Sequence, residues 1–239
     1  MESNRESIVV LTGAGISADS GLATFRGAGG LWEGHRVEDV ATPEAWERDP
    51  ATVWRFYQMR RAGLHRAQPN EAHRALARLE ESLRRVRIPF LLVTQNVDDL
   101  HDRAGSQPLH MHGELSRLRC ESCGFAQHDL EHLDPDVFVP CAWCPNPRTR
   151  PDVVWFGEMP YHLEAIGAAL SNCTHFIAIG TSGLVYPAAG FLTQARAHGA
   201  RTWVNSLDPP KNLHPEDRFL PGRAADVVPR LVAELEAGL

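Results

Sequence analysis

The 239-residue chain lacks a surplus of basic charge: it carries 24 Lys and Arg against 30 Asp and Glu, for a formal net charge of −6. Proteins that bind nucleic acid usually show a basic surplus or a basic stripe, so no nucleic-acid partner is expected. There is no apolar run of about 18 residues, so neither a transmembrane helix nor a membrane partner is expected. The polar residues 1–7 lead directly into an apolar run and leave no room for a signal peptide, so a cytoplasmic location is the default expectation.

Internal repeats and low-complexity tracts are also missing, and the composition, with 43% hydrophobic and 23% charged residues, is that of a globular protein. The length suits one α/β domain with a small satellite, or one large domain. Helical or mixed sequence separates several short apolar runs, which predicts an α/β fold with a doubly wound parallel sheet. The predicted strands are residues 8–11, 88–93, 153–156, 176–179 and 202–204.

Cysteine is scarce, with five residues, but four of them form two C-x2-C pairs separated by seventeen residues. Four thiolates at this spacing complete a tetrahedral Zn²⁺ shell and leave no position for a substrate, so we predict one structural zinc ion. Its role would be to hold together a loop-rich module with little core of its own. Cys173 stands alone and is expected to be a packed residue. The predicted zinc ligands are Cys120, Cys123, Cys141 and Cys144.

A glycine-rich turn follows the first predicted strand, and residues 13–18 match the pattern G-x-G-x-x-(G/A). Glycines there permit a tight turn and close approach of the backbone to a pyrophosphate. The acidic ribose ligand that usually follows about 20 residues later is missing, because residues 25–30 read as a loop. The turn predicts nucleotide binding without the standard ribose contact, which disfavours a dehydrogenase.

Polar residues 95–98 follow the second predicted strand, at the sheet edge where parallel strands present side chains to ligands. His101, His110 and His112 come soon after. His110 and His112 would share a face if the segment were extended, so a second metal site is conceivable, although no third ligand is defined. A neutral His beside a sugar hydroxyl could instead act as a general base. Composition alone does not choose between these roles and an ordinary structural His.

A helix is predicted from Asp49, an N-cap followed by Pro50, and a second helix from about Asn70. In the first helix, Arg60 lies within a stripe formed by residues 53, 56, 57 and 64. A charge in an apolar stripe is costly unless it is paired, so Arg60 either meets an internal acid, extends to solvent, or binds an anionic ligand together with Tyr57.

Taken together, these motifs resemble the sirtuin family, and the resemblance extends over residues 8–232. The closest likeness is to its bacterial and mitochondrial desuccinylase-type branch. The segments that carry it are Gly13-Ala14-Gly15-Ile16-Ser17, residues 21–26, Thr94-Gln95-Asn96-Val97-Asp98, His112-Gly113, the four zinc-type cysteines, Val153-Val154-Trp155-Phe156-Gly157-Glu158 and Gly180-Thr181-Ser182.

The resemblance implies two domains with NAD and an acyl-lysine meeting between them. Residues 1–32, 89–115 and 151–239 would form a Rossmann-like domain. Residues 33–88 would supply the helical part, and 116–150 the zinc module, of a smaller domain. The implied NAD-binding residues are Gly13, Ala14, Gly15, Ser17, Ala18, Thr24, Phe25, Arg26, Trp32, Gln95, Asn96, Val97, Asp98, Gly180, Thr181, Ser182, Asn205, Ser206, Leu207 and Ala224.

The resemblance also implies a reaction that consumes NAD, in which the acyl amide oxygen attacks the ribose carbon bearing nicotinamide. His112 would be the general base and would act with Asn96 and Asp98. Tyr57 and Arg60 match an acidic-acyl pocket, which favours succinyl- or malonyl-lysine. Residues 156–158 would pair with the substrate backbone as an added strand. The implied substrate-binding residues are Tyr57, Arg60, Val154, Phe156, Gly157 and Glu158.

The chain is thus predicted to be an NAD-dependent protein-lysine deacylase, with deacetylase and desuccinylase or demalonylase activity, that acts as a monomer on acylated proteins or peptides. Its products would be nicotinamide, free lysine and O-acyl-ADP-ribose. One alternative is an NAD-dependent protein ADP-ribosyltransferase on the same fold. Another is a non-enzymatic zinc module that binds nucleic acid or protein, which the acidic charge and the intact polar loop disfavour.

Overall fold

The computed structural model describes residues 6–23 and 31–238. Its centre is a six-stranded parallel sheet in the order β11-β10-β9-β1-β4-β5. The predicted parallel α/β sheet is therefore confirmed, and β5 and β11 extend it at the two edges. Its strands are β1 (Ile8–Thr12), β4 (Phe90–Thr94), β5 (Leu109–His110), β9 (His175–Ile179), β10 (Arg201–Ser206) and β11 (Arg218–Pro221).

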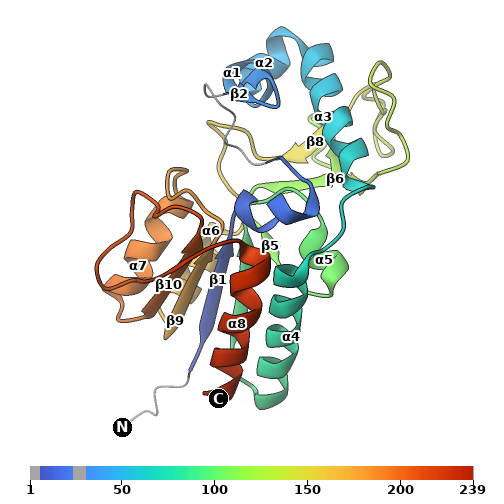
Figure 1. Cartoon of the computed structure of the whole chain (residues 1–239). Helices are drawn as coiled ribbons and strands as arrows, with labels where there is room; N and C mark the ends of the chain where they lie inside the picture. The colour runs from blue at the N-terminus through green and yellow to red at the C-terminus, as the bar shows by residue number, and fades with distance from the viewer. Residues whose placement is uncertain (1–5, 24–30, 239) are drawn as a thin grey trace.

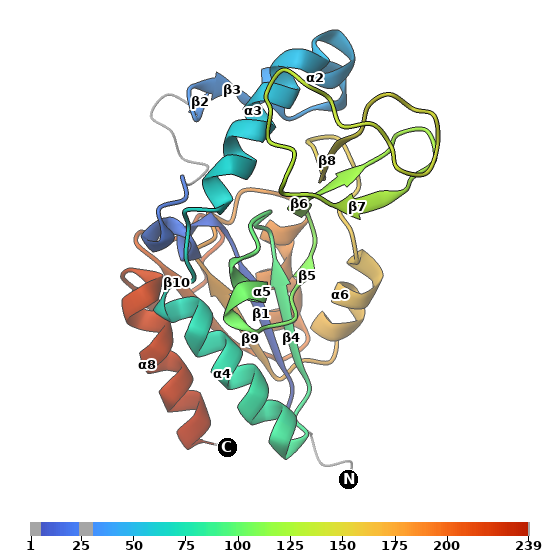
Figure 2. The ribbon, with the colours of Figure 1, turned by 90° about the vertical axis from the view of Figure 1, so that its right-hand side faces the viewer.

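Helices cover both faces of this sheet (Figures 1 and 2). On one face, α4 (Glu71–Val86) and α8 (Ala224–Ala237) lie side by side and share a core with β1 and β9. On the other face, α6 (Leu163–Leu170) and α7 (Phe191–Ala197) enclose a second core. The strands are buried on both faces, which is why their sequences are continuous apolar runs rather than alternating ones. We call this part of the molecule the large lobe.

A smaller lobe lies beyond the carboxyl ends of β1 and β4 (Figure 2). Its core is rich in tryptophan and joins the helical segment to a second, three-stranded sheet, in the order β7-β6-β8. We call it the small lobe. Its elements are β2 (Leu31–Trp32), β3 (His35–Arg36), α1 (Val37–Val40), α2 (Pro43–Arg48), α3 (Pro50–Leu64), β6 (Gly113–Arg119), β7 (Ala126–His128) and β8 (Arg150–Val153).

Two predictions about the layout differ from the structure. Residues 153–156 are not a parallel strand of the main sheet: β8 ends at Val153 and pairs antiparallel with β6. Residues 71–86, which were expected in the smaller domain, form α4, whose apolar side chains, including Leu76 and Leu79, pack in the core of the large lobe. A helix with one apolar face can cover either lobe, and its own pattern does not say which.

The helix starts follow the sequence closely. Asp49 caps α3 by accepting a hydrogen bond from the Thr52 amide at 3.1 Å, and Asn70 caps α4 by accepting one from Ala72 at 3.0 Å. Each cap satisfies a backbone donor that the helix leaves unpaired. The remaining short elements are η1 (Ala14–Ile16), η2 (Ala18–Ser20), α5 (Leu100–Ala104) and η3 (Ala188–Gly190). No helix of the described residues is long and apolar enough to cross a membrane.

Candidate active site

A cleft of about 1040 Å³ lies between the two lobes. Cofactor sites are usually concave and of a few hundred to about 1,000 Å³, so the cleft has room for a dinucleotide. All the residues predicted to bind NAD or substrate line it, apart from Thr24, Phe25 and Arg26, which lie outside the described residues. The structure thus brings together side chains from both ends of the sequence and from both lobes.

The glycine-rich turn packs directly on the loop after β9. The Gly15 amide donates a hydrogen bond to the Gly180 carbonyl at 2.9 Å. A Cβ atom at Gly15 would lie 2.7 Å from the Gly180 Cα, and one at Gly13 would lie 2.9 Å from the Gly180 oxygen. The glycines are therefore needed for the contact between two backbones at the floor of the cleft, as well as for the approach of a phosphate.

Three polar side chains form a hydrogen-bonded group beside this turn. The buried Ser17 hydroxyl donates to Asp98 Oδ2 at 2.9 Å and accepts a hydrogen bond from Asn96 Nδ2 at 3.1 Å. Burial raises the pKa of the Asp98 carboxyl, while the hydrogen bonds from the Leu100 amide and from Ser17 oppose the shift. The group is held in one arrangement before any ligand enters the cleft, as a preorganised polar site requires.

His112 is half-buried at the wall of the cleft. Its Nδ1 lies 2.9 Å from the carbonyl oxygen of Gln95, which can only accept, so Nδ1 carries the hydrogen. Burial lowers the pKa of His112, which keeps the ring neutral near pH 7. The Nε2 lone pair is then available to accept a proton, which is the state that a general base needs.

The other two histidines of the predicted cluster do not join His112 in a metal site. His110 Nε2 bonds the Asp102 carboxylate at 3.0 Å, and His101 Nε2 lies 3.1 Å from Thr12 Oγ1 in the interior. Burial lowers the pKa of His101 well below its ordinary range. Within the described residues, the four cysteines are the one group placed to hold a metal. His101 and His110 are therefore hydrogen-bonded to Thr12 and Asp102.

At the far end of the cleft, Asn205 offers an acceptor without a partner. Its Nδ2 donates to the carbonyl oxygens of Leu220 at 2.8 Å and Gly222 at 3.1 Å, which fixes the orientation of the amide. Its Oδ1 is buried and has no hydrogen-bond partner among the described residues. A buried acceptor left unpaired carries a desolvation cost that a hydroxyl of a bound ligand would remove, so a ribose fits here.

The predicted acyl-pocket residues Tyr57 and Arg60 both line the cleft. The Arg60 guanidinium stacks on Trp32 at 4.1 Å from the ring centroid, and its Nε lies 3.8 Å from Glu33. Glu33 is therefore the acidic partner that the sequence pattern allowed for Arg60, but the distance is close to the upper limit for an ion pair. The Nη1 atom of Arg60 is buried and has no hydrogen-bond partner among the described residues. Tyr57 Oη accepts a hydrogen bond from Trp155 Nε1 at 2.9 Å.

The segment predicted to bind the substrate backbone is partly used within the chain. The Phe156 amide donates to the Ala41 carbonyl at 3.0 Å, and the Glu158 amide donates to the Trp155 backbone carbonyl at 3.0 Å. The Glu158 carboxylate accepts two hydrogen bonds from Arg150, each of 2.8 Å. Glu158 therefore holds this loop in place, while the segment as a whole still lines the cleft.

The four predicted zinc ligands meet in the small lobe. Their sulfur atoms all lie within 4.8 Å of one another, with Cys120 to Cys144 at 3.6 Å and Cys123 to Cys141 at 3.7 Å. Zinc–sulfur bonds of about 2.3 Å in a tetrahedron separate the sulfurs by about 3.8 Å, so the cluster fits a four-thiolate zinc site. Cys173 is buried in the large lobe, as expected.

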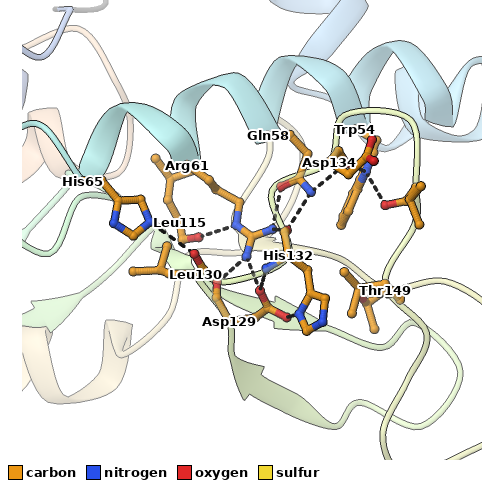
Figure 3. Close-up of polar contacts among 12 residues, drawn as sticks. Trp54, Gln58, Arg61, His65, Leu115, Asp129, Leu130, His132, Asp134 and Thr149 are labelled. Atoms are coloured by element: carbon orange, nitrogen blue, oxygen red, sulfur yellow. Dashed lines mark hydrogen bonds and ion pairs between the residues drawn. The ribbon is translucent and has the colours of Figure 1, made fainter.

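The sequence pattern singled out Arg60 but not the next residue of α3, Arg61. Arg61 is fully buried, and all its guanidinium nitrogens have acceptors (Figure 3). They are the carbonyl oxygens of Leu115, His132 and Asp129, the Gln58 side chain and the Asp129 carboxylate. This network fixes α3 to the loop that leads into the second cysteine pair.

Comparison with known proteins decides the family. The model of the Sir2 family matches residues 13–187. The chain belongs to the Sir2 family. It is 52% identical over 237 residues to an NAD-dependent protein deacylase of Shewanella oneidensis, covering 98% of this chain and 96% of that protein. It is 51% identical over 237 residues to the NAD-dependent protein deacylase of Escherichia coli strain K12, covering 97% and 83%.

Solved Sir2 structures agree with this assignment. A crystal structure of a Sir2 homolog–NAD complex superposes with a TM-score of 0.86 and 36% identity, covering 98% of this chain and 91% of that one. The sirtuin resemblance, the Rossmann-like fold and the four-cysteine zinc site predicted from the sequence are therefore confirmed. The roles of the individual cleft residues stay predictions.

Proposed function

We propose that this Sir2 protein is an NAD-dependent protein-lysine deacylase with a preference for acidic acyl groups. Relatives at 51–52% identity are named NAD-dependent protein deacylases, and a similar structure holds NAD. The observation that carries the acyl preference is Arg60, a cation at the cleft whose side chain is 13% exposed and whose Nη1 atom is buried without a partner among the described residues. The acylated lysine of a protein is the substrate, and O-acyl-ADP-ribose, nicotinamide and free lysine are the products.

Bound NAD supplies a ribose carbon with nicotinamide as its leaving group. The glycine-rich turn with Gly13 and Gly15 holds the phosphates, and the Asn205 Oδ1 atom accepts from the adenosine ribose. Asn96 and Asp98, fixed by Ser17, hold the nicotinamide end. These residues position the sugar so that the acyl oxygen reaches it along one direction.

His112 takes up the proton of a ribose hydroxyl through Nε2. Its Nδ1–H bond to the Gln95 carbonyl fixes the tautomer and keeps the ring pointing in one direction. Burial without an acidic partner keeps the imidazole neutral before the reaction, because its pKa is lowered. A neutral base beside the sugar is therefore ready at neutral pH.

Arg60 and Tyr57 bind the distal carboxylate of a succinyl- or malonyl-lysine. Planar guanidinium donors match the geometry of a carboxylate, and burial makes the ion pair stronger than it would be in water. Burial lowers the pKa of Arg60, and nearby Tyr57 and Glu33 oppose the shift. A second anion in the pocket would stabilise the charged guanidinium further.

The test is mass spectrometry of acetyl- and succinyl-lysine peptides incubated with enzyme, with and without NAD. Arg60→Met should lower kcat/KM on the succinyl peptide about 100-fold and change it less than threefold on the acetyl peptide. Arg55→Met, at an exposed arginine on the same helix, is the matched control and should leave both unchanged. Equal losses on both peptides would remove the acidic-acyl pocket.

The same experiment separates the deacylase from an ADP-ribosyltransferase, since a deacylase yields O-acyl-ADP-ribose and a transferase yields a modified protein. Absence of nicotinamide release would point to the non-enzymatic alternative. The cytoplasmic location and monomeric state remain predictions.

A further inference from the structure

Trp155 is buried beside Tyr57 and lines the cleft. Its ring lies in the small-lobe core, and its indole Nε1 lies 2.9 Å from Tyr57 Oη. An indole nitrogen can donate but cannot accept, so Tyr57 must be the acceptor in this bond. The hydroxyl hydrogen of Tyr57 therefore points elsewhere, and no acceptor for it occurs in the described part of the chain.

Two further contacts hold Trp155 in place. Its backbone amide donates to Glu158 Oε2 at 2.8 Å, and the Arg150 guanidinium stacks on its ring at 3.4 Å from the centroid. Arg150 in turn donates to both Glu158 oxygens and to the Val153 carbonyl. The indole donor is thus fixed by a partly buried ion pair as well as by packing.

Tyr57 keeps its proton under all ordinary assay conditions. Burial raises the pKa of Tyr57 to about 12, and the charge of Arg60 opposes that shift without cancelling it. The phenol is therefore a donor and not a competing anion beside Arg60. Together with Arg60 Nη1, the pocket presents two donors, beside the Glu33 carboxylate at 3.8 Å from Arg60 Nε. Two donors match a carboxylate and do not match a neutral acyl end.

We infer that Trp155 is a specificity-determining positioning residue, because its indole N–H turns the Tyr57 hydroxyl hydrogen toward the carboxylate of an acidic acyl group. The inference rests on the proposed acidic-acyl function and deepens it. The family resemblance assigns Glu158 to substrate binding and gives Arg150 no role. In this inference both residues act through Trp155.

The test compares three acyl-lysine peptides: acetyl, butyryl and succinyl. Butyryl has the chain length of succinyl with a methyl group in place of the carboxylate, so it reports packing without charge. Trp155→Phe keeps a buried ring and deletes the donor. It should raise KM for the succinyl peptide about five- to tenfold, with kcat unchanged, and leave KM for the butyryl and acetyl peptides within about twofold.

Trp54→Phe is the matched control. Trp54 is buried in the same aromatic cluster, and its indole donates to the carbonyls of Asp134 and Val137, but it does not line the cleft. Trp54→Phe should change KM for the acetyl, butyryl and succinyl peptides by the same factor. Tyr57→Phe is a second variant that leaves Trp155 in place; it should show the same succinyl-specific rise, and adding Trp155→Phe to it should produce no further rise.

Parallel rises in KM for butyryl and succinyl peptides in Trp155→Phe would overturn the inference, because they would mean lost packing. An unchanged succinyl KM would overturn it too. The proposed function fails by a different result, namely when the wild-type enzyme does not prefer succinyl to butyryl, or when Arg60→Met lowers activity on the two peptides equally. If Arg60→Met lowers activity on the succinyl peptide alone and Trp155→Phe leaves the succinyl KM unchanged, only the role of Trp155 is lost.

Discussion

Arg61 on α3 and Asp129 in the small lobe form an ion pair, Nη2 to Oδ1 at 2.9 Å, in which the arginine side chain is fully buried (Figure 3). Hydrogen bonds of the Asp129 carboxylate with Arg61 and His132 lower its pKa, against the opposing effect of burial. Because Tyr57 and Arg60 lie on the same helix as Arg61, this pair fixes the helix that carries the proposed acyl pocket to the loop preceding Cys141.

Arg61→Met should destabilise the protein by about 3–5 kcal/mol, because it leaves the Asp129 carboxylate buried without its cation. The measurement is urea unfolding followed by tryptophan fluorescence. Arg55→Met, which breaks an exposed pair with Asp136 on the same helix, should cost at most about 1 kcal/mol. Similar losses in the two variants would mean that the buried pair does not anchor α3.

His112 should control the acidic side of the pH profile. Its lowered pKa means that the ring loses its role as a base only when the pH falls below the ordinary histidine value of about 6.5. We expect the acidic limb of kcat/KM for NAD to lie below that value and His112→Gln to reduce turnover about 100-fold or more. His128→Gln, at an exposed histidine, is the control. An acidic limb above pH 7 would contradict the assignment.

Local motifs explain why so much of the cleft was predictable from the sequence. A strand followed by a glycine turn, or by polar residues such as Gln95 and Asp98, has its geometry set within a few residues, and parallel strands then bring those ends together. The approach of Gly15 to Gly180 was not predictable in detail, because it depends on the packing of two distant loops.

Helix α3 shows where the sequence pattern fails. Its buried residues include Trp54, Gln58 and Arg61 as well as the predicted stripe with Tyr57, so the helix is enclosed on more than one side. A helix with a single apolar stripe is expected to expose its other residues to solvent. For that reason the sequence pattern singled out Arg60 and not Arg61. The partners of Arg61 are mainly backbone carbonyls, which leave no signature in a sequence.

Loss of zinc should loosen the small lobe. Cys141→Ser removes one of four sulfurs, and metal-site free energy is folding free energy in a module with little core of its own. We expect the wild type to bind one zinc ion per chain and Cys141→Ser to bind less and to melt at lower temperature. Cys173→Ala, at a buried cysteine of the large lobe, should keep the full zinc content. Equal zinc content in both variants would refute the four-cysteine site.

Gly15→Ala tests the contact between the glycine-rich turn and the loop after β9. The added Cβ would lie 2.7 Å from Gly180 Cα and 2.9 Å from its oxygen, so one backbone must move. We expect a loss of stability of about 1–3 kcal/mol and a KM for NAD raised about tenfold, because the same movement disturbs the floor under the phosphates. Gly180 has a positive φ of 63° and cannot easily take up the strain.

Gly167→Ala is the matched control for Gly15→Ala. Gly167 lies within α6, and a Cβ there meets nothing within 4 Å. Alanine should stabilise this helix by about 0.5–1 kcal/mol and leave KM for NAD unchanged, because it restricts the unfolded chain without crowding the folded one. Thermal unfolding and initial rates at varied NAD measure both variants. If Gly15→Ala behaved like Gly167→Ala, the close approach of the two loops would have no part in holding the dinucleotide.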